Sequence, residues 1–224
     1  MNHNILRQRL CACTWLNDPI DSLCRELDEI EKWIDGHSSL PNPCKEKMLL
    51  AFERIKDCPR LVIIGQDPYP DSKATGIAFQ TRSNVYSSSL DTLSKSLGIC
   101  DGYYPNIGKW GDELGILMLN AALCNFGKCG EEEILCRWRK FIIEVVLKIR
   151  GQKSNVVVML LGKEHVWDIF ADDEYIIKCK HPAFGWGPTF DDWMKAQDLL
   201  GDEDLIRNLA NNPVEINGRE KSNI

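Results

Sequence analysis

The chain has 224 residues, of which 44% are hydrophobic and 27% are charged, so it is long and apolar enough for one α/β domain with a substantial core, and a disordered protein is excluded. Its formal net charge of −6 argues against a nonspecific polyanion binder, although one cleft can still carry a local positive field. No apolar run is long enough to cross a membrane and residues 1–7 lack the apolar core of a signal peptide, so we expect a protein that is not secreted and that resides in the cytoplasm, or in the nucleus of a eukaryote.

The ten cysteines are spread along the chain without a Cys-x-x-Cys pair, and only Cys11 and Cys13 are closely spaced. Zinc and iron–sulfur sites normally use tighter pairs, so we expect no metal and no cofactor. Without an export signal, the cysteines are interpreted as reduced thiols that act as small hydrophobic residues of the core.

The N-terminal part of the chain predicts two helices. Residues 1–17 show no pattern and are expected to form an irregular N-terminal extension. A first helix is predicted after Asp18 with Pro19 at its first position, because apolar residues then recur at helical spacing. Asn42 is predicted to cap a second helix, with Pro43 at its first position.

Strands and helices alternate in the rest of the chain. Runs of branched apolar residues predict buried strands at 61–64, 116–119, 156–161 and 175–179. Helical periodicity predicts helices at 90–97, 107–114, 131–150, 164–170, 189–200 and 203–211. This alternation is typical of the α/β class, so we predict a single domain, residues 1–224, with three α/β/α layers around a central, mostly parallel four-stranded sheet.

Polar residues stand where three of these strands end. Gln66 and Asp67 follow the first strand, Asn120 ends the second, and His181 follows the fourth. The carboxyl ends of parallel strands share one edge of a sheet, so these side chains are expected to converge on one pocket. Taken singly, each of these residues can have a purely structural role, as a turn former, a cap or a loop residue.

The chemistry of these side chains suits a planar polar ring. Asp67 can act as a base or stabilise a cation, and His181 can donate to a developing anion or accept a proton. Asn120 offers a donor and an acceptor side by side, as needed to read the edge of a pyrimidine, and Phe79 offers a face for stacking.

The segment after the first strand is a stiff loop. Pro68 and Pro70 remove two N–H groups and favour extended or turn geometry, so the loop presents Tyr69 rigidly. Farther on, the serines 87–89 precede a predicted helix, where they can bind a phosphate or serve only as helix caps.

Taken together and in order, these motifs resemble those of the uracil-DNA glycosylases over roughly residues 40–218. The resemblance is carried by Gly65-Gln66-Asp67-Pro68-Tyr69-Pro70, by 76–79, 88–90, 117–123 and 161–163, and by His181-Pro182-Ala183. It implies a monofunctional DNA repair enzyme that flips uracil out of DNA and hydrolyses its N-glycosidic bond, leaving an abasic site. It further implies a monomer that binds single- or double-stranded DNA and needs no cofactor, with a glycosylase inhibitor protein or a replication protein as additional partners.

The resemblance also assigns roles in recognising the base. Phe79 would stack on the uracil, and Asn120 would pair with its N3 and O4 edge. Tyr69 would crowd C5 and thereby exclude the methyl group of thymine, while Gln66 would contact the base and shape the pocket. A site that reads hydrogen bonds rejects cytosine, because buried polar groups would be left unpaired.

Two further roles concern bond cleavage and the DNA backbone. Asp67 would stabilise the sugar cation and orient the attacking water, and a neutral His181 would donate to O2 as the uracil anion leaves. Ser88 or Ser89 and the loop at Ala183 would hold phosphates.

The chain departs from the family pattern in two places. Pro70 stands where the family usually has histidine. The last motif usually reads His-Pro-Ser-Pro-Leu-Ser, whereas here Ala183 replaces the phosphate-binding serine and Gly185 replaces the leucine that fills the hole left by the flipped base. We therefore predict that Phe184 or Trp186 acts as the apolar wedge; alternatively both pack inward and the protein acts on bases that are already unpaired.

Two other functions remain as alternatives: a glycosylase for another modified pyrimidine, and a weakly catalytic DNA-binding or replication accessory protein. The presence of both Asp67 and His181 argues against the second. Because the net charge is negative, the positive rim that DNA requires is expected from Lys73, Arg82, Lys128, Lys163 and Lys180.

Overall fold

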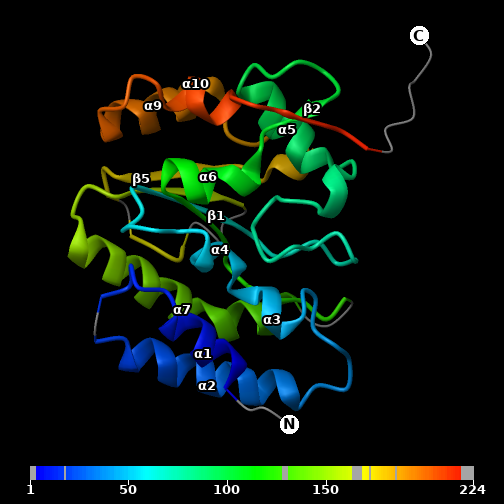
Figure 1. The fold of residues 1–224 in the computed structure, drawn as a ribbon, viewed down its shortest axis with the longest axis vertical. Helices are drawn as coiled ribbons and strands as arrows, with labels where there is room; N and C mark the ends of the chain where they lie inside the picture. The colour runs from blue at the N-terminus through cyan, green and yellow to red at the C-terminus, as the bar shows by residue number, and fades with distance from the viewer. Residues whose placement is uncertain are drawn as a thin grey trace.

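A four-stranded parallel sheet lies at the centre of the molecule, which the computed structural model describes over residues 4–17, 19–127, 131–162, 168–171, 173–184 and 186–217 (Figure 1). Its strands are β1 (Leu61–Gly65), β3 (Ile116–Asn120), β4 (Val157–Leu161) and β5 (Ile176–Cys179), in the order β3-β1-β4-β5. Parallel pairing places Gly65 beside Asn120, so the strand ends share one edge as predicted.

Helices cover both faces of the sheet (Figure 1). On one face lies α7 (Glu131–Gln152), with α2 (Asp21–Asp35) and α1 (Ile5–Cys11) packed outside it. The other face carries α5 (Ser88–Ser96), α6 (Ile107–Leu114), α9 (Phe190–Leu200) and α10 (Leu205–Ala210). The shorter elements are α3 (Lys45–Met48), α4 (Leu50–Glu53), η1 (Arg82–Asn84), η2 (Pro182–Phe184) and an antiparallel pair, β2 (Tyr103–Tyr104) and β6 (Val214–Glu215). The three-layer prediction is confirmed.

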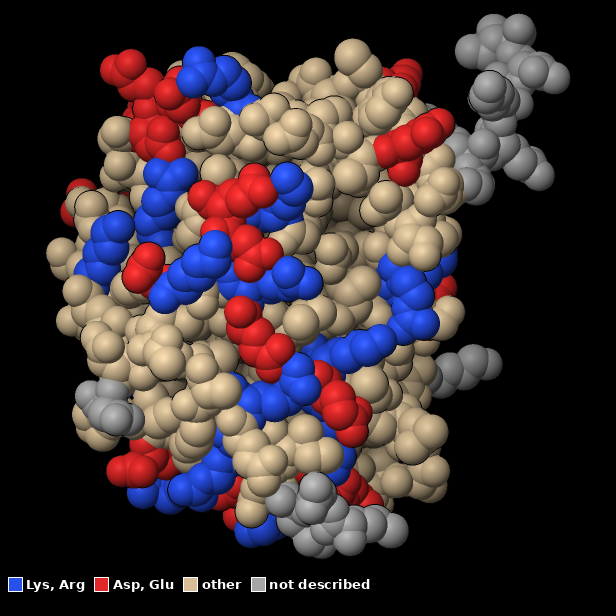
Figure 2. Space-filling model, viewed as in Figure 1, with Lys and Arg blue, Asp and Glu red and all other residues tan. Residues whose placement is uncertain are grey.

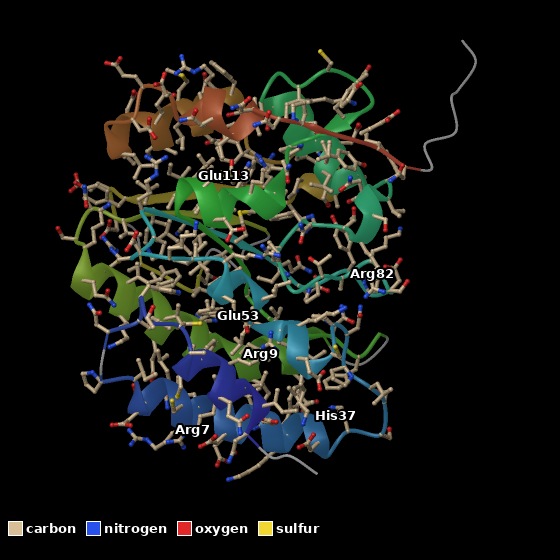
Figure 3. The ribbon with its side chains drawn as sticks, viewed as in Figure 1. Arg7, Arg9, His37, Glu53, Arg82 and Glu113 are labelled. Carbon is tan, nitrogen blue, oxygen red and sulfur yellow. The ribbon has the colours of Figure 1, made fainter. Side chains whose placement is uncertain are left out.

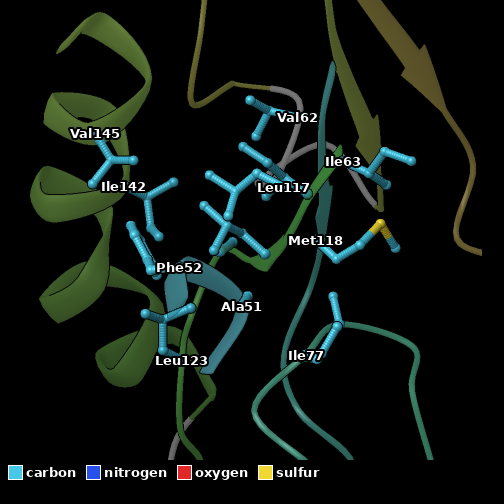
Figure 4. Packing of buried hydrophobic residues seen from close by; sticks show 14 of the residues in the cluster. Ala51, Phe52, Val62, Ile63, Ile77, Leu117, Met118, Leu123, Ile142 and Val145 are labelled. Carbon is cyan, nitrogen blue, oxygen red and sulfur yellow. The ribbon is translucent and has the colours of Figure 1, made fainter. Parts of the chain in front are cut away.

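The core follows from the alternation of side chains along the strands. Figure 4 shows Val62 and Leu117 pointing toward Ile142 of α7, while Ile63 and Met118 point to the opposite face of the sheet. All five residues of each of β1, β3 and β4 are buried, as expected for a sheet covered on both sides. This packing fixes the strand ends that carry the polar residues.

The expectation of an irregular N-terminal extension is wrong, because residues Ile5–Cys11 form helix α1. Its first turn is capped from a distance: the buried carboxylate of Glu31 accepts the main-chain N–H groups of Ile5 and Leu6, each at 3.1 Å. Arg9 of this helix also pairs with Glu53 at the end of α4, with Nε and Oε1 2.6 Å apart (Figure 3). The cap lies in another helix, so no local pattern could reveal it.

The prediction for Asn42 is also wrong. Its side chain does not cap a helix; the amide donates to the main-chain carbonyls of Tyr69 and Asp71, both at 2.6 Å, and the next helix, α3, begins only at Lys45. Asn42 thereby clamps the loop that follows β1. The first predicted helix begins at Asp21 rather than at Pro19.

The remaining helix predictions agree with the structure to within a few residues, and α6 has the predicted bounds. The helix expected at 164–170 falls mostly outside the described residues. In the part of the chain that the structure describes, no helix is both long and apolar enough to span a bilayer.

Candidate active site

A cavity of about 500 Å³ opens where β1, β3 and β5 end. Its lining includes five of the six residues predicted to carry chemistry or to contact a base: Asp67, Tyr69, Phe79, Asn120 and His181. Segments that are more than a hundred residues apart in the chain therefore meet in one pocket, as the parallel topology predicts.

Gln66 is the predicted residue that does not line the cavity. It lies half-buried directly after β1, and its main-chain carbonyl accepts the N–H of Ala122 at 3.1 Å. The role visible in the structure is thus to tie the end of β1 to the loop after β3, and direct contact with a base remains a prediction.

Phe79 and Asn120 occupy one tightly packed corner of the cavity. A Cβ atom on Gly65 would lie 2.6 Å from Oδ1 of Asn120 and 2.8 Å from Cζ of Phe79, so only glycine leaves room for both side chains. Phe79 has a φ of 62°, in the left-handed region that a bulky residue rarely adopts. The fold therefore holds the ring in a strained backbone position beside the amide.

Tyr69 is fixed by a small polar network. Its hydroxyl lies 2.7 Å from the hydroxyl of Ser87 and 3.3 Å from the carbonyl of Phe79, to which it can donate. Tyr104 orients Ser87 in turn, because its hydroxyl accepts the Ser87 N–H at 2.6 Å and donates to the Ser87 carbonyl at 3.0 Å. Burial raises the pKa of Tyr69 to about 12, so its phenol stays neutral at physiological pH.

Sequence reasoning missed the supporting roles of Ser87 and Tyr104. The serine stands in a run that reads as a helix cap, and the tyrosine stands in a connection without periodicity. Only the approach of β2 to the start of α5 brings them together.

The main chain sets the state of the imidazole of His181. The N–H of Ala183 donates to Nδ1 of His181 at 3.1 Å, and Nδ1 can accept only when it carries no proton. A neutral ring bonded in this way carries its proton on Nε2, which is then a hydrogen-bond donor. The residue that replaces the family's serine thus contributes through its main chain.

The serines at the start of α5 contribute to the lining of the cavity. Ser88 and Ser89 both line it, as does Ala183. Ser87 occupies the N-cap position but its side chain makes no capping bond, so the explanation of these serines as helix caps alone is wrong for Ser87.

The wedge loop is described only in part. Trp186 is 63% exposed, so inward packing is wrong for this residue; the ammonium of Lys180 lies 4.4 Å from the centre of its ring. Gly185 and the side chain of Phe184 lie outside the described residues.

The expected positive rim is modest. Lys73 lines the cavity with its Nζ 3.5 Å from Asp71. Arg82, labelled in Figure 3, is exposed, and its main-chain N–H donates to the carbonyl of Lys73 at 3.0 Å. On the face drawn in Figure 2, basic and acidic side chains interleave instead of forming a field of one sign. Lys128 and Lys163 lie outside the described residues. Among the described side chains, no group of three His, Cys, Asp or Glu residues is arranged to hold a metal ion.

Asn120, Phe79, Asp67 and His181 thus line one cavity at the carboxyl edge of a parallel sheet. This defines the molecule as an α/β protein with a pocket at its strand ends. The sequence matches the uracil DNA glycosylase superfamily over residues 52–196. It is 30% identical over 158 residues to the uracil-DNA glycosylase of Azobacteroides pseudotrichonymphae, an alignment that covers 65% of this chain and 70% of that protein. The chain belongs to the uracil DNA glycosylase superfamily.

Solved structures show the same fold. The crystal structure of UNG from Nitratifractor salsuginis aligns with a TM-score of 0.62 at 20% identity, covering 92% of this chain and 98% of that one. A variant of mimivirus UNG in complex with UGI aligns with a TM-score of 0.66 at 18% identity, covering 81% of each chain.

Proposed function

We propose that the protein hydrolyses the N-glycosidic bond of uracil in DNA and leaves an abasic site. The observation that carries this proposal is the meeting of Asp67, His181, Asn120 and Phe79 in one cavity at the sheet edge of a chain that belongs to the superfamily. A base reaches such a cavity only when it has left the helical stack, so the DNA is bound with the uridine flipped out.

Recognition of the base relies on fixed side chains. Phe79 stacks on the ring, and the amide of Asn120 accepts from N3–H and donates to O4. Cytosine presents an N4 amino group and an unprotonated N3, so neither hydrogen bond to Asn120 can form. Binding cytosine would leave these buried polar groups unpaired, and this desolvation cost favours uracil. The network behind Tyr69 keeps this residue close to C5, where a methyl group would collide.

Cleavage separates charge between the sugar and the base. As the C1′–N1 bond breaks, its electron pair goes to the uracil, and negative charge develops on O2. The Nε2–H of His181 donates to that oxygen, because the Ala183 N–H holds the opposite nitrogen unprotonated. Asp67 stabilises the positive sugar and orients a water, whose oxygen forms the new bond to C1′ and whose proton is released.

The loop after β1, which carries Asp67, has Pro70 where the family usually has histidine. Pro70 lines the cavity but offers no donor or acceptor side chain, so Asp67 has one polar neighbour fewer for positioning the water. We infer a slower hydrolysis step than in members with that histidine, with base recognition unaffected.

Incubation with single- and double-stranded oligonucleotides that contain one uracil tests the proposal. The expected products are free uracil and an alkali-labile abasic site, and Asp67→Asn is expected to lower the rate by at least about 100-fold without changing DNA affinity. Release of another modified pyrimidine but not of uracil would favour the first alternative. DNA binding without release of any base would favour an accessory role.

Two partners follow from this function. DNA is the substrate, bound by a chain that acts as a monomer. A glycosylase inhibitor protein is the second, since a mimivirus relative has been solved with UGI; inhibition of uracil release by equimolar UGI is the test.

A further inference from the structure

A second hollow adjoins the proposed active site. Its volume is about 500 Å³, and it is lined by Trp186, Pro188 and five residues of α5: Ser88, Asp91, Thr92, Lys95 and Ser96. Ser88 lines both hollows, so they are neighbours across the first turn of α5. Nothing in the proposed mechanism uses the second hollow.

Trp186 is unusual among the tryptophans that the structure describes. Trp110, Trp138 and Trp193 are fully buried, whereas Trp186 is 63% exposed. Leaving a large aromatic ring in water forfeits the stabilisation that its burial would bring, so an exposed indole beside a hollow points to a ligand with an apolar face.

The residue after Trp186, Gly187, packs closely against α5. A Cβ atom on Gly187 would lie 2.9 Å from Cγ2 of Thr92 and 3.0 Å from Cβ of Pro182, so the backbone passes too close for any larger residue. Lys180 lies over the indole at 4.4 Å and adds positive charge beside the ring. The backbone directly after the indole is thus packed closely against α5 and η2.

We propose that this hollow binds the nucleotide next to the flipped uridine, with its base stacked on Trp186. The inference rests on the proposed function. Adjacent nucleotides are joined through one phosphate, so a strand that places uracil in the first hollow must pass its neighbour over Ser88. Lys180 supplies positive charge for the backbone, whereas the Nζ of Lys95 lies 2.9 Å from Oδ2 of Asp91 and is largely neutralised by it. An aromatic platform accepts any base, which is the usual mode of single-strand binding.

This role differs from that of a wedge. A wedge fills the hole that a flipped base leaves in a duplex, so its loss would weaken action on duplex DNA alone. A stacking platform binds a neighbour that has itself left the stack, so its loss also weakens action on single strands.

Single-stranded oligonucleotides with one uracil, in which one flanking nucleotide at a time is replaced by a baseless spacer, test the proposal. For the wild-type protein, kcat/KM is expected to fall about 5- to 100-fold when the spacer occupies one particular flanking position, the range that stacking on an aromatic side chain supports. Trp186→Ala should show the same fall with the complete substrate and no further fall with that spacer. Phe190→Ala is the matched control, because Phe190 is an exposed aromatic (55%) that lines neither hollow.

The platform proposal would be refuted if the spacer lowered kcat/KM of Trp186→Ala as much as that of the wild type. It would also be refuted if the spacer lowered kcat/KM of the wild type equally at every flanking position. Fluorescence anisotropy of the same labelled oligonucleotides measures binding independently of catalysis. If the wild type releases no uracil but its Kd rises with the spacer at one position, and Trp186→Ala abolishes that rise, then the proposed function fails and the platform stands.

Discussion

Gly65→Ala adds a single methyl group at the end of β1 and should disable the base pocket. The new Cβ would lie 2.6 Å from Oδ1 of Asn120 and 2.8 Å from Cζ of Phe79, where ordinary contacts begin near 3.4 Å. Neither neighbour can shift without leaving the position proposed for uracil binding.

The size of the effect follows from what must move. Overpacking of a tight site costs about 1–3 kcal/mol of stability. If the ring and the amide move away, the base loses a stacking contact of about 1–3 kcal/mol and a net hydrogen bond of about 0.5–1.5 kcal/mol. A combined loss of about 2–4 kcal/mol in the transition state lowers kcat/KM by about 30- to 1,000-fold.

The assay is uracil release under single-turnover conditions, with the folded fraction checked by circular dichroism at the assay temperature. Gly151→Ala is the matched control: it makes the same change in helix α7, where nothing lies within 4 Å of the new Cβ, and a gain of about 0.5–1 kcal/mol is expected without any change in activity. In Gly65→Ala/Asn120→Ala the collision with Oδ1 is removed, so stability should recover partly while activity does not. Wild-type kcat/KM in a folded Gly65→Ala protein would refute the packing argument.

Three further outcomes are expected. Tyr104→Phe leaves the N–H of Ser87 without its partner, while the Ser87 carbonyl keeps the N–H of Asp91 at 3.0 Å, and should lower the free energy of unfolding by about 1–3 kcal/mol; it should also raise thymine release relative to uracil release, and an unchanged ratio would mean that the network does not position Tyr69. Burial raises the pKa of the Cys124 thiol to about 12 from its ordinary value near 9, so only the unfolded chain ionises between these values; urea unfolding should show stability falling as pH rises above about 9, and Cys124→Ala should reduce that slope. DNA affinity should fall steeply with added salt, because phosphate contacts release counterions, and a flat log Kd against log salt would contradict the expected positive rim.

The sheet was predictable because its information is local. Branched apolar runs marked all four strands to within one residue of their observed ends. In β1, β3 and β4 every residue is buried, so the apolar pattern is continuous, and β5 remains recognisable although Lys178 is exposed. The failures arose where the deciding partner is distant in sequence. Helix α1 depends on a carboxylate at position 31, and Asn42 serves carbonyls at 69 and 71.

The site was predictable in its reactive groups but not in its support. Asp67, Asn120 and His181 stand at strand ends, where the topology must bring them together. Ser87 and Tyr104 support Tyr69 through contacts that form only in the folded chain, and no spacing in the sequence indicates these contacts. The glycine at position 65 ended a strand pattern, but the two side chains it admits became visible only in three dimensions.

Because the Ala183 N–H binds His181 through the main chain, substitutions in this loop can change its side chains without changing the tautomer of the histidine. Every amino acid except proline supplies the same amide proton, so side chains at position 183 can drift without disturbing where the histidine keeps its own proton. The tautomer of the His181 imidazole therefore does not depend on the side chain at position 183. The residues after Ala183 can therefore be substituted, and the contacts with the nucleic acid strand altered, while the proposed hydrogen bond from His181 to the base is kept.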